Sequence, residues 1–218
     1  MKSLLRGLTL VLFLAICVIP SFAQVLYENG PINGQTDAWT INFGFIISDT
    51  FTISGQASQV GGMSFGAWLT PGDTLESTEL IISSQEVGGG TVYFDGQVNI
   101  TQSGCSLNQY SFDICTETAM FNGPTLNTGT YWVSLENAVS SDGDPVYWDE
   151  NSGIGCHSEG CPSEAGNGGI FGATLPSESF SILGTQGTGP GSTPEPGSLV
   201  LFASGILAGA SVLRRKLR

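Results

Sequence analysis

Lysine and arginine are missing from the whole middle of this sequence. The 218 residues include only six lysines and arginines, all of which lie near the two ends: Lys2, Arg6, Arg214, Arg215, Lys216 and Arg218. Residues 24–193 therefore have no lysine or arginine, although they hold every acidic residue of the chain except Glu195. Nucleic acids and anionic lipids are bound through such basic groups. The sequence thus excludes both as natural partners of this region. Divalent cations and neutral molecules remain as candidate partners.

Histidine is almost absent as well. The single histidine, His157, lies between Cys156 and Cys161, where we interpret it as an exposed loop residue. A Ser-His-Asp triad needs a rigidly positioned histidine, and hydrolytic zinc sites use several. Glycoside hydrolysis stays open because it needs only two carboxylates at a suitable separation, but the sequence singles out no pair. We therefore expect a non-enzymatic protein, with a glycosidase as the less favoured alternative.

Helical periodicity is the third feature that residues 24–184 lack. Short stretches of alternating apolar and polar residues occur instead, and they predict strands at residues 38–43, 49–53, 63–69, 79–83, 91–100, 108–116, 129–135, 146–148 and 178–183. Turn-forming runs such as Pro71-Gly72-Asp73 and Gly88-Gly89-Gly90 separate them. This pattern predicts an all-β domain over residues 24–183, an antiparallel β-sandwich of the jelly-roll type.

The first 23 residues have the pattern of a secretory signal peptide. Lys2 and Arg6 precede an apolar run at residues 8–19, and the small residues Ser21 and Ala23 follow it. Cleavage after Ala23 would fit this arrangement. The alternative is an uncleaved anchor, which is disfavoured because the run is shorter than the ~20 residues that span a bilayer.

Four cysteines remain once Cys17 is assigned to the signal peptide: Cys105, Cys115, Cys156 and Cys161. An even number of cysteines in an exported chain predicts disulfides. We favour the short-range pairing, Cys105 with Cys115 and Cys156 with Cys161, because two cysteines ten residues apart can face each other across a hairpin. A four-thiolate zinc site is the alternative, but zinc-binding cysteine pairs are usually closer in sequence.

The end of the chain combines three features in order. Pro194-Glu195-Pro196 precedes an uncharged apolar segment at residues 197–213, and a basic cluster formed by Arg214, Arg215, Lys216 and Arg218 follows directly. The apolar segment predicts a short transmembrane helix whose basic end stays in the cytoplasm. Residues 184–193, rich in Gly, Thr and Pro, predict a flexible linker before it.

These features resemble the PEP-CTERM sorting signal of Gram-negative bacteria. The resemblance implies that Pro194, Glu195 and Pro196 are recognised by an exosortase, that residues 197–213 are a transient inner-membrane anchor, and that residues 214–218 retain the basic end. It also implies processing by signal peptidase and exosortase, and final delivery to the cell surface or the exterior. An ordinary single-pass anchor is the alternative. Residues 129–135 and 147–153 resemble ectodomains that carry such tails, which have no settled activity to transfer.

A cluster of oxygen-bearing side chains suggests a calcium site. The residues concerned lie within ten positions of each other: Asp142, Asp144, Asp149, Glu150 and Asn151. Carboxylate and amide oxygens are the ligands that Ca²⁺ prefers, although the spacing is not that of an EF-hand. The alternative is that these side chains bind backbone amides of a turn. No other cofactor is expected.

Adjacent aromatic residues suggest a second interaction. On a strand, one member of the pair Tyr147-Trp148 faces the solvent, and Trp132 belongs to a similar pair. An exposed ring with polar neighbours can bind a neutral sugar, whereas in the alternative the tryptophans belong to the core.

The sequence therefore predicts an exported, surface-sorted, non-enzymatic protein of the cell envelope or extracellular matrix. A carbohydrate-binding module that engages exopolysaccharide is the alternative.

Overall fold

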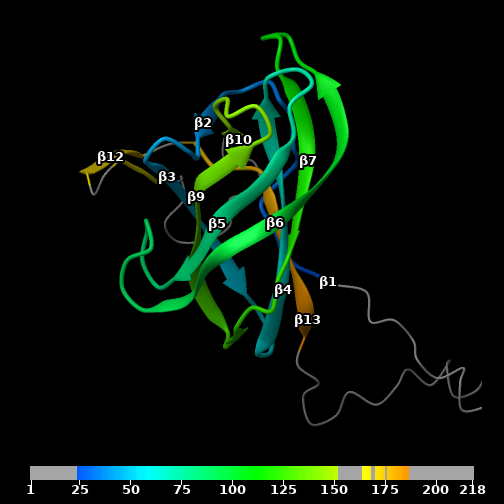
Figure 1. Ribbon diagram of the computed structural model, residues 1–218. Helices are drawn as coiled ribbons and strands as arrows, with labels where there is room; N and C mark the ends of the chain where they lie inside the picture. Colours follow the sequence, from blue (N-terminus) through cyan, green and yellow to red (C-terminus); the bar gives the residue numbers. More distant parts are fainter. Residues whose placement is uncertain (1–23, 152–163, 168–169, 175, 187–218) are drawn as a thin grey trace, which may run out of the picture. The chain divides into compact units, whose positions relative to one another are not determined.

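The computed structural model describes residues 24–151, 164–167, 170–174 and 176–186 (Figure 1). All regular secondary structure among these residues is β-strand, which confirms the predicted all-β class. The predicted signal peptide, the Cys156–Cys161 pair, the sorting motif and the transmembrane segment at residues 197–213 lie outside the described residues. Within the described part, the search for a helix of membrane-spanning length and hydropathy finds none.

The thirteen strands of the described residues form one curled antiparallel sheet. Their bounds are β1 Gln24–Glu28, β2 Ala38–Thr40, β3 Phe45–Ile53, β4 Ser58–Leu69, β5 Leu75–Ser83, β6 Val92–Leu107, β7 Asp113–Met120, β8 Thr125–Leu126, β9 Gly129–Ser140, β10 Tyr147–Asp149, β11 Glu164–Asn167, β12 Ile170–Thr174 and β13 Phe180–Gln186. The order is β1-β13-β4-β7-β6-β5-β9-β3-β11-β12; β8 and β10 pair with β4, and β2 pairs with β10.

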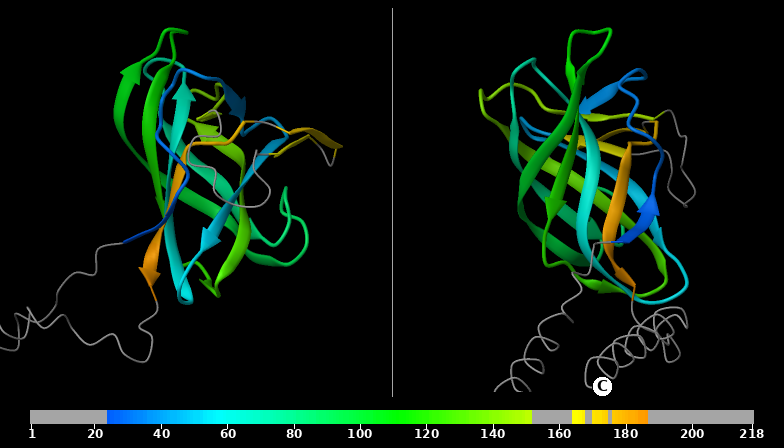
Figure 2. Two further views of the ribbon diagram at one scale, coloured as in Figure 1. Left: turned by 180° about the vertical axis from the view of Figure 1, so that it is seen from behind. Right: turned by 90° about the vertical axis from the view of Figure 1, so that its right-hand side faces the viewer.

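The long strand β6 turns this sheet into two facing layers (Figure 2). Its first half, Val92–Asn99, pairs with β5, and its second half, Ile100–Leu107, pairs with β7. The strand thus passes from the layer of β5, β9 and β3 to the layer of β4, β7 and β13. The architecture is sandwich-like, as predicted, but its two layers are one continuous sheet because a single 16-residue strand belongs to both.

All nine predicted strand regions contain a strand, but four strands were not predicted: β1, β8, β11 and β12. The predicted strand at residues 108–116 was partly wrong, since residues 108–112 form the turn between β6 and β7. The turn is set by Asn108, whose side-chain oxygen accepts hydrogen bonds from the backbone N–H groups of Tyr110 (2.9 Å) and Phe112 (3.0 Å).

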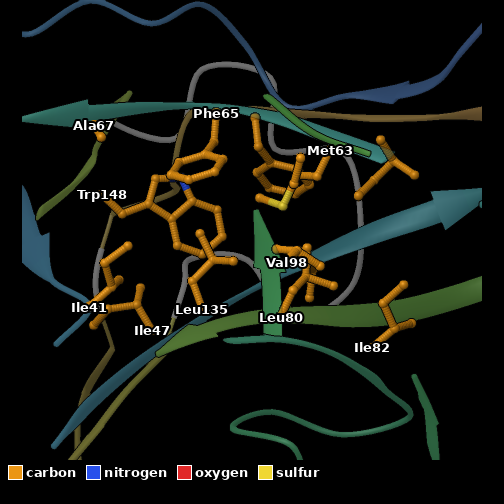
Figure 3. Packing of buried hydrophobic residues seen from close by; sticks show 14 of the residues in the cluster. Ile41, Ile47, Met63, Phe65, Ala67, Leu80, Ile82, Val98, Leu135 and Trp148 are labelled. Atoms are coloured by element: carbon orange, nitrogen blue, oxygen red, sulfur yellow. The ribbon is translucent and has the colours of Figure 1, made fainter. Parts of the chain in front are cut away.

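The core lies between the two layers, where inward-facing side chains of both meet (Figure 3). Trp148 is its largest fully buried side chain. Its ring packs edge-on against Phe65 and Phe180, with centroids 6.2 and 5.7 Å away, and its indole N–H donates to the carbonyl of Ser179 (3.1 Å). Burying large aromatic side chains supplies much of the driving force for such a fold.

A buried polar seam joins β1 to β3 across the curl of the sheet. Asp49, on β3, accepts hydrogen bonds from the Asn29 side chain (2.9 Å), the Ser177 hydroxyl (2.7 Å) and the Glu178 backbone N–H (2.9 Å). The Asn151 side chain donates to the Asn29 and Glu178 carbonyls. Neutral donors therefore connect four segments that are distant in the sequence.

The last strand runs further than predicted. β13 continues through Gln186 because Gly184, Thr185 and Gln186 stay in register with β4, so the boundary of the compact unit follows Gln186 rather than residue 183. Gly184 allows this pairing: a Cβ there would lie 2.1 Å from the Gln59 carbonyl oxygen. The neighbouring Gly61, on β4, has room for a Cβ, because the nearest atoms would be 3.8 and 3.9 Å away.

We expect Gly184→Ala to lower the free energy of unfolding of the full chain by roughly 1–3 kcal/mol, because the added methyl forces β13 away from β4. Gly61→Ala is the matched control and should change it by less than about 1 kcal/mol. Urea denaturation followed by tryptophan fluorescence measures both. Equal effects of the two substitutions would contradict the close approach at Gly184.

Candidate functional site

The loop between β1 and β2, residues 29–37, lies directly on the outer face of β4. Gly66 of β4 makes this approach possible, because a Cβ at that position would lie 2.8 Å from Ile32 Cγ2 and from Ser179 Oγ. The neighbouring residues Ala67 and Leu69 face the core, so Trp68 faces outward from the same strand. The loop and Trp68 therefore share the outer face of this layer.

Asp149 holds the loop in place. One carboxylate oxygen accepts the backbone N–H of Asn33 (2.9 Å) and the hydroxyl of Ser179 (3.0 Å). The other accepts the backbone N–H of Gly34 (2.9 Å) and the indole N–H of Trp68 (2.6 Å). Four neutral donors thus occupy the oxygens of this fully buried carboxylate, which gives Asp149 a structural role.

The hairpin of β6 and β7 (Figure 1) lies beside this loop. Cys105 and Cys115 are joined by a disulfide across the two strands, which confirms this half of the predicted pairing. Asn108, at the turn, donates from its side-chain amide to the Gly34 carbonyl (3.1 Å). Gly34 has a positive φ of 61°, and a Cβ there would lie 2.6 Å from Ile114, so the loop and the hairpin meet in close contact.

A hollow of about 580 Å³ opens between the loop and the hairpin. Its lining contains six amide or hydroxyl side chains, three apolar side chains and two glycines, and no ionisable group: Ile32, Asn33, Gly34, Gln35, Gly104, Ser106, Leu107, Asn108, Gln109, Ile114 and Thr116. A hollow of this volume lies within the ~300–1,000 Å³ range of small-molecule sites. Its walls offer hydrogen bonds without offering charge.

An aromatic row borders the hollow on the same face. Trp68 pairs across the strands with Ile114, which lines the hollow. Tyr110 stacks on Trp68 with ring centroids 5.6 Å apart and 20° between the planes, and Phe112 joins Trp68 to Tyr147. Tyr110 covers Trp68, which is only 5% exposed, while 52% of Tyr110 itself stays exposed.

Sequence reasoning did not find this site. The prediction of a strand at residues 108–116 concealed the turn that carries Asn108, Gln109 and Tyr110. The available signals were the turn-forming Asn33-Gly34 pair and the cysteines that mark the hairpin. Neither indicates that the loop and the hairpin lie together, because their contact depends on the tertiary fold.

The three predicted sugar-binding residues do not form one site. Trp148 was a wrong choice, because it is fully buried in the core and presents no face to a ligand. Tyr147 is half-buried and lies in the aromatic row of the β4 layer. Trp132 is half-buried on β9, in the other layer, where it pairs with Thr50 and Ser83.

The predicted calcium ligands serve in different places. Asp142 and Asp144 lie in the turn between β9 and β10, where the Asp144 carbonyl accepts from the Ser140 hydroxyl (3.0 Å). Asp149 holds the loop, and Asn151 belongs to the seam. No three histidine, cysteine, aspartate or glutamate side chains of the described residues come together in a group that could hold a metal ion.

Three buried carboxyl groups have raised pKa values. Burial raises the pKa of Asp49 to about 6, although hydrogen bonds from Ser177, Glu178, Thr50 and Asn29 oppose the shift. Burial alone raises the pKa of Glu117 to about 8. Neither of its oxygens has a hydrogen-bond partner among the described residues. On β7 it has the same parity as Cys115 and Ala119, which face the core.

Glu150 is the third of these groups. Its pKa rises to about 7, first because of burial, and further because of the charges of Asp37 and Asp149; a hydrogen bond with the Trp39 side chain acts in the opposite direction. No lysine or arginine occurs in residues 24–193. Protonation is therefore the way in which Glu117 and Glu150 can lose their charge within the fold, whereas Asp49 is compensated by its hydrogen bonds.

Carboxylates also crowd the outer face of the other layer. Glu79 of β5 lies opposite Glu136 of β9. The pKa of Glu136 is raised by burial and by the charges of Glu79 and Asp95. The pKa of Asp95 on β6 is raised by burial and by its interaction with Glu79. Like charges on neighbouring strands destabilise a sheet, so this face also favours protonation.

We expect the melting temperature of the full chain to fall between pH 5 and pH 8. The pKa values of Asp49, Glu150 and Glu117 are higher in the folded state than their ordinary values of 3.8 and 4.5, so the folded state binds more protons than the unfolded state. Stability is therefore greatest below these ordinary values and is lost as the pH rises through about 6, 7 and 8. A decrease of more than roughly 4 °C by calorimetry is expected. A melting temperature that rises over this range would contradict it.

Glu117→Gln should remove part of this pH dependence. The substitution keeps the size of the side chain and eliminates its charge, so we expect little change in melting temperature at pH 5 and an increase at pH 8. Glu76→Gln is the matched control, because Glu76 is exposed on β5. If both substitutions act alike at pH 8, burial of the Glu117 charge is not the cause.

Comparison with known proteins finds one match, in the tail of the chain. Residues 192–216 match the family model for the PEP-CTERM protein-sorting motif. No curated protein and no solved structure matches the chain. The matched residues include the Pro-Glu-Pro sequence, the apolar segment and most of the basic cluster, which confirms the resemblance drawn from them. The chain thus combines a PEP-CTERM protein-sorting motif in its tail with an all-β domain.

Proposed function

We propose that this protein is held transiently in the inner membrane by residues 197–213, is cut by an exosortase-type enzyme near Pro194-Glu195-Pro196, and then acts without catalysis in the cell envelope or extracellular matrix. The match of residues 192–216 to the PEP-CTERM sorting motif carries this proposal. A motif of this kind marks an exported protein that an exosortase sorts. The location and the role after processing are our inference.

The chemistry of the ectodomain agrees with a location outside the cytoplasm. The disulfide between Cys105 and Cys115 is a bond that persists in oxidising compartments. The excess of acidic side chains over residues 24–193 favours solubility there. Both features suit a domain that works after export.

Two features support a non-enzymatic role. The hollow beside β6 and β7 has no ionisable side chain in its lining, so it lacks the acid and base that general acid–base catalysis needs. Asp49 and Glu117, whose pKa values are strongly raised, are fully buried and cannot flank a glycosidic bond. The glycosidase alternative gains no pair of carboxylates from the hollow or from these two buried groups.

Replacing Pro194, Glu195 and Pro196 together by alanine should abolish processing in a host that has an exosortase. We expect the wild-type protein to appear in the surface or extracellular fraction without its basic tail. The variant should stay in the inner membrane with Arg218 retained, because the enzyme no longer recognises the motif. Cell fractionation and intact-protein mass spectrometry measure both properties.

The control replaces Thr188, Gly189 and Pro190 by alanine, since these residues lie just outside the matched segment. It should be processed like the wild type. Normal cleavage and release of the Pro194–Pro196 variant would show that sorting does not depend on the motif. Wild-type protein that reaches the surface with its basic tail intact would also contradict the proposal, because it would not have been cut.

A further inference from the structure

We propose that the hollow between residues 32–35 and the β6–β7 hairpin, together with the ring of Tyr110, binds a neutral oligosaccharide. This proposal goes beyond the sorting function, because it assigns a ligand to the ectodomain. It concerns different residues from Trp132 and Trp148, which the sequence had suggested.

The lining of the hollow selects an uncharged, hydroxyl-rich ligand. Within the described part of the chain, the side chains of Gln35, Ser106 and Gln109 make no hydrogen bond to other protein groups. They are therefore available as donors and acceptors. The lining of the hollow has no carboxylate to pair with a cation. It has no basic side chain to pair with an anion, and residues 24–193 contain no lysine or arginine. Neutral sugar hydroxyls match amide and hydroxyl groups of this kind.

Tyr110 supplies the apolar surface that a sugar ring needs. One face of its ring stacks on Trp68, and about half of its surface stays exposed. It follows directly on Asn108 and Gln109, which line the hollow. A pyranose ring has a flat face of C–H groups, which packs against an aromatic ring while its hydroxyls bind polar neighbours. The ring and the amides together therefore form a platform with a polar wall.

The site is already rigid before a ligand arrives. The disulfide fixes the hairpin, four hydrogen bonds to Asp149 fix the loop and its surroundings, and Asn108 joins the two. A preorganised site does not lose this conformational entropy on binding, which raises affinity. The disulfide and these hydrogen bonds are therefore more typical of a binding site than of a surface loop without function.

The test uses the full chain, purified in a detergent without a sugar headgroup and applied to an array of neutral and anionic oligosaccharides. We expect binding to neutral members, with affinity then measured by calorimetry. Tyr110→Ala and, separately, Gln109→Ala should each weaken binding at least tenfold. Tyr93→Ala is the matched control, since Tyr93 is an exposed tyrosine of β6 (41%) outside the hollow, and it should bind like the wild type.

Gln109 lies on an exposed turn, so its substitution leaves the fold intact even if Tyr110→Ala destabilises it; melting temperatures check both variants. Three results would each overturn the proposal: no binding to any neutral oligosaccharide, a preference for anionic ones, or full affinity of Gln109→Ala. Loss of affinity in Trp132→Ala with Gln109→Ala unchanged would move the site to the other layer and reject the hollow. None of these results bears on processing of the tail, which is measured separately.

Discussion

The absence of lysine and arginine from residues 24–193 decides how this fold handles its buried acids. A buried carboxylate must be compensated, and here only neutral donors are available. Asp49 and Asp149 solve this by accepting several hydrogen bonds each, from backbone N–H groups, hydroxyls, an amide and an indole. The donors come from segments far apart in the chain. Each carboxylate therefore connects several segments. The position of the β1–β2 loop depends on Asp149, and the closure of the sheet depends on Asp49.

Glu117 and Glu150 show the cost of the same constraint. Each has at least one buried oxygen without a hydrogen-bond partner among the described residues. Where donors are lacking, burial favours the neutral, protonated form and raises the pKa. For Glu117 burial is the whole cause, and for Glu150 the charges of Asp37 and Asp149 add to it. The charge composition of the domain therefore leads us to expect a stability that depends on pH.

The sequence predicted what depends on local pattern and failed where tertiary contacts decide. Alternation located β3, β4, β5 and β9, because apolar side chains that face the core recur at alternate positions of each strand. Short strands such as β8, with two residues, have no room for alternation. Predicting the candidate site would have required knowing that Gly34 lies against Ile114 in the fold, and the spacing of residues in the sequence does not reveal this. The Cys105–Cys115 pair was predictable because a hairpin is local, and the sorting motif because its charge and apolar pattern are contiguous.

The extension of β13 to Gln186 determines how the ectodomain bears mechanical load. β13 lies between β1 and β4 and is hydrogen-bonded to both. A pull on the chain beyond Gln186, from a membrane or any later attachment, is directed along a strand that has a neighbour on each side. Two ladders of backbone hydrogen bonds then resist the force together, so the strand nearest the attachment point is one of the best secured against being peeled away.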